Sequence, residues 1–318
     1  MTSSEPDGRD GAAATGTVPT EAGATANTAS GNVANGAGAA EAPVLTRRRQ
    51  LGSPSARSLL LTLLGEFVLP RDEPVWTQVL LNALGELGVE QKSGRQALAR
   101  TAAEGLLCSD RAGRRVRWLL SEMGRRLLST GAERIYSFGT ATEPWDGRWL
   151  VLLVSVPESR RQLRHRLRSR LAWAGMGTPA PGVWLSARPD KQHEVAEVVT
   201  ELGLDKVSSS FVGAFGRIGH ERELVAQAWN LADVETDYRE FISVFSAADP
   251  LTPRAVLREQ VQLVHAWRRF PFLDPQLPAQ LLPGGWAGTQ ARELFHDRHE
   301  HWAGAAGAHW DQLCAGIT

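Results

Sequence analysis

The sequence predicts a multidomain α+β protein of 318 residues. The chain is longer than one hydrophobic core usually serves, and 42% of its residues are hydrophobic. The hydrophobic pattern also changes along the chain: helical spacing and a hairpin come first, alternating strands and helices follow, and proline-broken helices end it. We therefore expect a tail at 1–52 and three folded units at 53–130, 131–218 and 219–318.

The tail and the overall composition limit where the protein works. Residues 1–46 are almost wholly small or polar, so they cannot bury enough apolar surface to offset lost chain entropy, and we expect them to be disordered. The tail ends in Arg47, Arg48 and Arg49, which either form a solvated linker or contact phosphates. Two cysteines, no signal-peptide pattern and no apolar run of membrane length predict a cytoplasmic protein outside the membrane.

The first folded unit contains three helical patterns followed by a hairpin. The helical patterns cover 54–67, 75–87 and 91–104, and glycines follow the second and third. A turn signal at 110–113 then leads into a strand in which apolar residues alternate with Arg115 and Arg117. A further helix begins after Ser121. This order predicts a winged helix-turn-helix domain.

The third helix and the hairpin are the candidate DNA reader. Small residues, including Gly94, Ala97, Thr101 and Gly105, fall on one side of this helix, which lets it lie close to the second helix and leaves a basic side outward. Arginine can bridge guanine O6 and N7, and glutamine can pair with adenine. The predicted DNA-binding residues are Lys92, Ser93, Arg95, Gln96, Arg100, Arg111, Arg114, Arg115 and Arg117. The alternative is an ordinary solvated helix and hairpin.

The second unit alternates strands and helices. An apolar run at 149–156 has the composition of a buried strand, and a helix with an apolar stripe from Leu163 to Ala174 follows. Strands at 183–185 and 207–212, a helix at 194–202 and a short strand near Met176 complete the pattern. The order predicts a small ferredoxin-like α+β domain.

The third unit is predicted to be mostly α-helical. Its segment from Phe270 to Trp286 has too many prolines for a long helix and too many aromatics for a free loop, so it should pack against something. It forms either a rigid seam between domains or one wall of an effector pocket. A histidine group at 296, 299, 301 and 309 lacks a recognised ligand spacing, so we predict surface histidines and no metal site.

Several stretches resemble the PaaX-like repressors of phenylacetic acid catabolism. The resemblance covers nearly all of 55–318, and it is carried by 63–67, 95–100, 113–115, 146–149, 165–168, 180–185 and the dense run Trp267–Pro275, which continues to Trp286. Thr101 departs from the family, which favours leucine there, and the long tail is an addition. The resemblance implies a dimeric, non-enzymatic, nucleoid-associated repressor. Its central domain would resemble CRISPR-associated ferredoxin-fold nucleases, and an aryl-acetyl-coenzyme A would release it from double-stranded operator DNA.

The effector is expected to be phenylacetyl-CoA or a related acyl-CoA, with no bound cofactor. The predicted effector-binding residues are Arg164, Arg168, Trp267, Arg268 and Arg269. The four arginines are included because arginine forks match phosphate oxygens. The helix from Arg160 to Arg170 is rich in arginine, and its alternatives are contact with a DNA backbone or a solvated face.

Two enzyme classes remain as alternative functions. A metal-dependent nuclease would need an acidic ligand at the end of the first central strand, where Val154 to Pro157 offers none and Glu158 comes late. An enzyme acting on CoA thioesters would need a nucleophile paired with a base, and none is visible.

Overall fold

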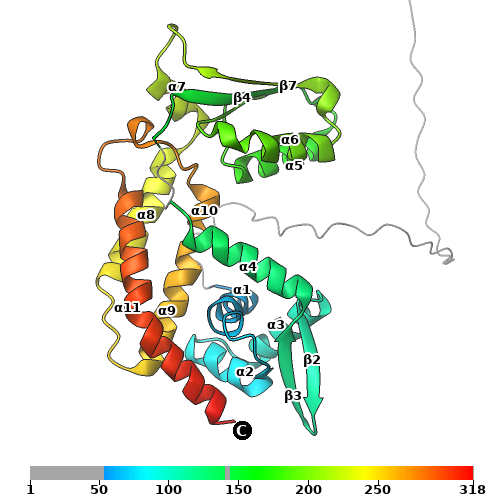
Figure 1. The fold of residues 1–318 in the computed structure, drawn as a ribbon, viewed down its shortest axis with the longest axis vertical. Helices are drawn as coiled ribbons and strands as arrows, with labels where there is room; N and C mark the ends of the chain where they lie inside the picture. The colour runs from blue at the N-terminus through cyan, green and yellow to red at the C-terminus, as the bar shows by residue number, and fades with distance from the viewer. Residues whose placement is uncertain (1–53, 140–143, 318) are drawn as a thin grey trace, which may run out of the picture. The chain divides into compact units, whose positions relative to one another are not determined.

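A computed structural model of the chain describes residues 54–139 and 144–317 (Figure 1). The predicted disordered tail and the phosphate contact considered for Arg47, Arg48 and Arg49 lie outside these residues. The structure is a mixed α+β fold with two small sheets and a helical C-terminal part. None of the helices in the described ranges combines the length and the apolar character that a membrane crossing requires.

The N-terminal part follows the predicted order of elements. Ser55 caps the start of α1 by accepting a hydrogen bond from the Ser58 amide at 3.1 Å. At its other end α1 passes directly into a π-helical turn, η1. Ser121 caps α4 through the Gly124 amide at 2.9 Å. The elements are α1 (Ala56–Leu63), η1 (Leu64–Val68), β1 (Val75–Trp76), α2 (Thr77–Glu86), α3 (Gln91–Ala103), β2 (Leu107–Ala112), β3 (Arg115–Leu120) and α4 (Glu122–Tyr136).

Three details differ from the sequence-based predictions. Val75 and Trp76 do not begin the second helix, because their extended backbone pairs with β3 and gives the sheet order β1-β3-β2. The hairpin turn lies at Gly113 and Arg114 rather than at 110–113, since Gly113 adopts a φ of 64°, which favours glycine in a two-residue hairpin. Gly105 lies beyond the end of α3 and is exposed, so it does not belong to that helix's buried side.

The C-terminal helices share one hydrophobic core with the N-terminal part. The indole of Trp310 stacks on Phe67 with ring centroids 5.0 Å apart, and both side chains belong to one buried cluster with Leu80 and Trp267. The N-terminal and C-terminal helices therefore stabilise each other through packing. The C-terminal elements are α8 (Leu231–Ser246), α9 (Pro253–Trp267), α10 (Phe270–Leu273), η4 (Ala279–Leu281) and α11 (Ala287–Ala315).

A buried polar network also joins these parts. The carboxylate of Glu66, in the π-helical turn, accepts a hydrogen bond from the Tyr136 hydroxyl at one oxygen. Its other oxygen lies 3.0 Å from His299 Nε2 and accepts a bond from Gln260 Nε2 at 3.2 Å. Burial, followed by the nearby Glu66 charge, raises the pKa of Tyr136 above its ordinary range. The Glu66 carboxylate thus joins α4, α9 and α11 to the π-helical turn that continues α1.

The middle part has its own sheet and core. Its strands are ordered β5-β6-β4-β7, and every neighbouring pair is antiparallel. Leu150 and Leu152 face α5 and α6, which cover one side of the sheet (Figure 1). Trp149 and Leu185, on the opposite side, pack with α7. The elements are β4 (Arg148–Val154), α5 (Arg161–Trp173), β5 (Gly177–Ala180), β6 (Val183–Ser186), η2 (Pro189–Lys191), α6 (Gln192–Glu201), η3 (Asp205–Val207), β7 (Ser208–Ala214) and α7 (Glu221–Ala228).

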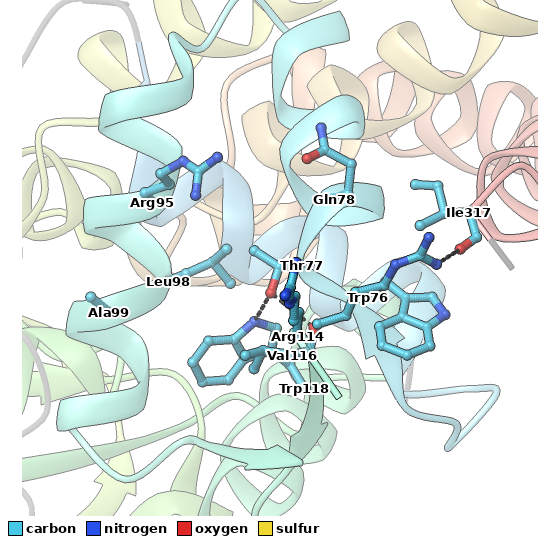
Figure 2. A pocket seen from close by; sticks show the side chains of 11 residues that line it. Trp76, Thr77, Gln78, Arg95, Leu98, Ala99, Arg114, Val116, Trp118 and Ile317 are labelled. Carbon is cyan, nitrogen blue, oxygen red and sulfur yellow. Dashed lines mark hydrogen bonds between the residues drawn. The ribbon is translucent and has the colours of Figure 1, made fainter. Parts of the chain in front are cut away.

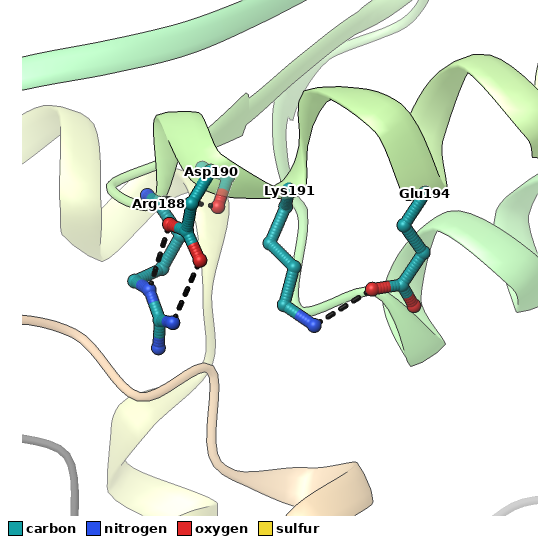
Figure 3. A network of polar contacts seen from close by, with 5 residues as sticks. Arg188, Asp190, Lys191 and Glu194 are labelled. Carbon is teal, nitrogen blue, oxygen red and sulfur yellow. Dashed lines mark hydrogen bonds and ion pairs between the residues drawn. The ribbon is translucent and has the colours of Figure 1, made fainter.

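Local ion pairs fix the turn that leads from β6 into α6 (Figure 3). Arg188 donates to both carboxylate oxygens of Asp190, at 3.0 and 2.8 Å, and Lys191 pairs with Glu194 at 2.7 Å. The hydrogen bonds from Arg188 lower the pKa of the Asp190 carboxyl. These charges satisfy one another within the turn, so we assign them a local structural role.

Candidate nucleic-acid interface

A groove of about 590 Å³ lies between α3 and the β2–β3 hairpin (Figure 2). Arg95, Leu98 and Ala99 line it from α3, while Arg114 and Arg115 line it from the hairpin. Trp76 and Gln78 contribute from β1 and the start of α2. The groove therefore brings two segments of the predicted DNA reader to one surface.

The small residues of α3 determine how closely this helix approaches α2. A Cβ atom on Gly94 would lie 2.9 Å from Leu81 Cδ2, so glycine permits the close approach. Ala97 and Leu98 are buried next to it. Thr101 is also fully buried, and its hydroxyl donates to the Ala97 carbonyl at 2.8 Å. This packing explains how threonine is accommodated where the family resemblance favours leucine.

The predicted reader residues of α3 point away from that packing. Lys92, Arg95, Gln96 and Arg100 are exposed, and Ser93 is half-buried. Arg95 alone of these five lines the groove. An exposed basic and amide-bearing helix side has the chemistry needed to contact base edges and phosphates in a major groove.

The hairpin arginines differ in what holds them. Arg111, Arg114 and Arg115 are exposed, whereas Arg117 is half-buried and pairs with Asp110 at 2.5 Å. The Arg117 guanidinium also lies 5.3 Å from the centre of the Trp76 ring. Its charge is therefore balanced by a carboxylate within the hairpin, which makes it the least suited of the four to hold a phosphate.

Sequence reasoning missed the side chains that fasten the hairpin to α2. The Trp118 indole donates to Thr77 Oγ1 at 2.8 Å, and the Thr77 hydroxyl donates to the Val116 carbonyl at 3.0 Å. The sequence pattern placed Trp76 in a helix, so its position in the groove had no visible signal. Gln78 and Ile317 also line the groove and were not singled out by their sequence context.

The structure does not gather the five predicted effector residues into this groove. Trp267 is fully buried, and its indole donates to the Ile135 carbonyl at 3.3 Å. Arg164 lies 3.6 Å from Glu158, Arg168 is exposed, and Arg269 pairs with Asp237 at 2.7 Å. A role in effector binding therefore stays a prediction for this set.

Arg268 is held between α1 and α9. Its guanidinium donates to the Ser58 carbonyl at 3.3 Å and to Thr62 Oγ1 at 3.2 Å. Burial, and then the charge of Arg57, lowers its pKa. These contacts place Arg268 within the packing of α9 against α1, which is a structural role.

The proline-rich segment after Arg269 is packed on both sides. Phe270 stacks on Tyr238 with ring centroids 4.1 Å apart, and Phe272 lies 4.9 Å from Trp173 of α5. Asp274 accepts a hydrogen bond from the Tyr238 hydroxyl at 2.7 Å. The contacts favour the seam interpretation, because the segment joins α8 to the middle part.

The histidines of α11 have separate surroundings. His299 contacts Glu66, His309 lies 3.1 Å from Glu86, and His301 is exposed. Desolvation lowers the pKa of His296. Within 54–139 and 144–317 no group of three or more His, Cys, Asp or Glu side chains is arranged to hold a metal ion.

Comparison with known proteins covers most of the chain. Residues 55–124 match the PaaX-like protein family, 142–225 match the PaaX protein central Cas2-like domain, and 229–312 match the PaaX-like protein C-terminal domain. The chain belongs to the PaaX-like family. This PaaX-like chain is 33% identical over 265 residues to Transcriptional repressor PaaX of Escherichia coli strain K12, covering 79% of the chain and 82% of that protein.

A solved structure has the same general fold. An uncharacterized protein from Mycobacterium tuberculosis aligns with a TM-score of 0.56 and 22% sequence identity. The alignment covers 80% of this PaaX-like chain and 98% of the Mycobacterium tuberculosis chain. The similarity concerns the fold alone.

Proposed function

We propose that this PaaX-like protein is a transcriptional repressor that binds operator DNA through α3 and the β2–β3 hairpin. The observation that carries the proposal is the groove lined by Arg95, Arg114 and Arg115, with exposed basic residues around it. We assign the helices and hairpin at 54–136 as a winged helix-turn-helix, in which α3 enters the major groove. The name and identity of the Escherichia coli relative support the repressor assignment.

The DNA contacts divide into two kinds. Arg95 and Gln96 stand on the exposed side of α3 and would read base edges. Arg114 and Arg115 would hold phosphates, which fix register without reading sequence. We further propose that the middle part, with its β-α-β-β-α-β order of elements, is a ferredoxin-like domain. We also propose that the protein acts as a homodimer on half-sites roughly 34 Å apart.

Fluorescence anisotropy with DNA from upstream of the protein's own gene tests the DNA assignment. The wild type should bind this DNA more tightly than a scrambled duplex. Arg95→Ala should lose about 1–3 kcal/mol of that discrimination, while Arg114→Ala should weaken both duplexes alike and flatten the salt dependence. Arg222→Ala removes an exposed arginine on α7 and serves as the matched control. Unchanged operator preference in Arg95→Ala would overturn the choice of reading helix.

For the effector, we propose an aryl-acetyl-CoA thioester such as phenylacetyl-CoA, acting on a repressor of a phenylacetate-type catabolic operon. The family resemblance supports this choice. Adding phenylacetyl-CoA to the preformed complex should release the DNA, whereas free coenzyme A at the same concentration should not. Retained binding with the thioester would refute the effector and leave the DNA assignment standing.

A further inference from the structure

We propose that the C-terminal end of the chain is part of the DNA-binding machinery, because the main-chain carbonyl of Ile317 positions Arg115 to hold a DNA phosphate. The inference rests on the proposed function. Arg115 Nη1 donates to the Ile317 oxygen at 2.7 Å, and Ile317 lines the same groove as Arg95 and Arg114. In Figure 2, Ile317 and Arg95 stand on opposite sides of Trp76 and Thr77.

The chemical nature of this contact distinguishes Arg115 from its neighbour in the hairpin. A carbonyl oxygen is neutral, so this hydrogen bond directs the guanidinium without forming an ion pair. Arg117, by contrast, is paired with the carboxylate of Asp110. Arg115 is exposed and also lies 5.9 Å from the centre of the Trp76 ring, a second contact that restricts it. The result is an oriented, charged fork suited to phosphate oxygens.

The carbonyl can act this way because the end of α11 is fastened to the reader. Trp310 stacks on Phe67, and Asp311 pairs with Arg71 at 2.9 Å. His309 lies 3.1 Å from Glu86, at the end of α2. These three contacts occupy consecutive residues of α11, so they hold its final turns in one place against the N-terminal part.

Orienting Arg115 before binding reduces the side-chain entropy lost when DNA binds. Losing this orientation should weaken affinity about two- to tenfold. The arginine itself would remain, so the sequence preference and most of the salt dependence should persist. Removing Arg115 should cost more than removing the contact, because the phosphate partner then disappears as well.

The test is a double-mutant cycle on operator affinity, measured by anisotropy. A chain ended after Cys314 removes the Ile317 carbonyl. Its new terminal carboxylate lies about one helical turn before the position of Ile317. The truncation is made in the wild-type and Arg115→Ala backgrounds, and Gln312→Ala, at an exposed position of α11 outside the groove, is the matched control. Thermal melting of each variant confirms folding.

We expect the truncation to weaken binding about two- to tenfold in the wild-type background and to have no further effect in Arg115→Ala. Gln312→Ala should bind as the wild type does. Equal weakening in both backgrounds, or none in either, would overturn the role of the carbonyl. Failure of the full-length protein to prefer operator DNA would instead refute the proposed function.

Discussion

Replacing Trp310 with alanine tests whether the DNA reader and the C-terminal helices form one cooperative unit. The indole is 1% exposed and stacks on Phe67 at an interplanar angle of 13°. Truncating a buried tryptophan to alanine removes transfer free energy and leaves a cavity, which costs about 3–5 kcal/mol. Because Phe67 belongs to the N-terminal part, the loss should be shared by α1, α2 and α3 as well as by α9 and α11.

Hydrogen exchange followed by mass spectrometry measures this sharing segment by segment. A loss of about 3–5 kcal/mol raises the opening equilibrium by roughly two to three and a half orders of magnitude, and amides in both parts should lose similar protection. Trp184→Ala is the matched control, because Trp184 is 7% exposed in the separate core of the middle part. It should lower protection in β4 to β7 and spare α1 to α3. Unchanged protection of α1 to α3 in Trp310→Ala would refute the shared core.

Three further predictions address single sites. Gly124→Ala should destabilise the fold by about 1–3 kcal/mol in urea unfolding, since its Cβ would lie 2.1 Å from the Leu106 carbonyl oxygen. Gly131→Ala on the same helix is the control, because the added Cβ would have no atom within 4 Å. This change should stabilise the fold by up to about 1 kcal/mol. Burial, and then Arg268, lowers the pKa of His265 to about 4, whereas an unfolded histidine titrates near 6.5. The unfolded chain binds the proton first, so the contribution of neutral His265 is complete above about pH 6.5 and is lost as the pH falls toward 4, by up to roughly 3 kcal/mol. Urea unfolding at pH 7.5 and 5 should show a smaller difference in His265→Gln than in the wild type. Arg117→Ala should weaken DNA binding less than Arg114→Ala in the anisotropy assay, because Arg117 is paired with Asp110.

Local sequence signals predicted the reader helix well. The bounds of α3 and its buried residues Gly94, Ala97 and Thr101 follow from helical spacing and the glycine that ends the pattern. The strand β1 was missed because its partner, β3, lies about forty residues away, and apolar residues beside a helix give the same local pattern. The hairpin turn was misplaced because the turn residues before Gly113 also favour a turn.

The contacts that complete the candidate site were beyond local reasoning. A periodic pattern identifies which residues of α11 are buried, but not that Trp310 packs on Phe67 or that Ile317 reaches Arg115. The same limit applies to Arg268, whose charge suggested an anionic ligand. Its carbonyl and hydroxyl partners on α1 are separated from it by about two hundred residues.

The shared core bears on the proposed release of DNA by an acyl-CoA. A ligand shifts an equilibrium between two arrangements of a protein only if it binds them with different affinity. A flexible joint between the N-terminal helices and the C-terminal helices would provide two such arrangements at little cost in free energy. Here Glu66, His299 and the Phe67–Trp310 stack join the two parts through buried contacts. The proposed release would therefore repack α9 or α11 against α1, and such a change would move Ile317 and with it Arg115. The groove would then lose an oriented arginine in the same step that alters the position of α3.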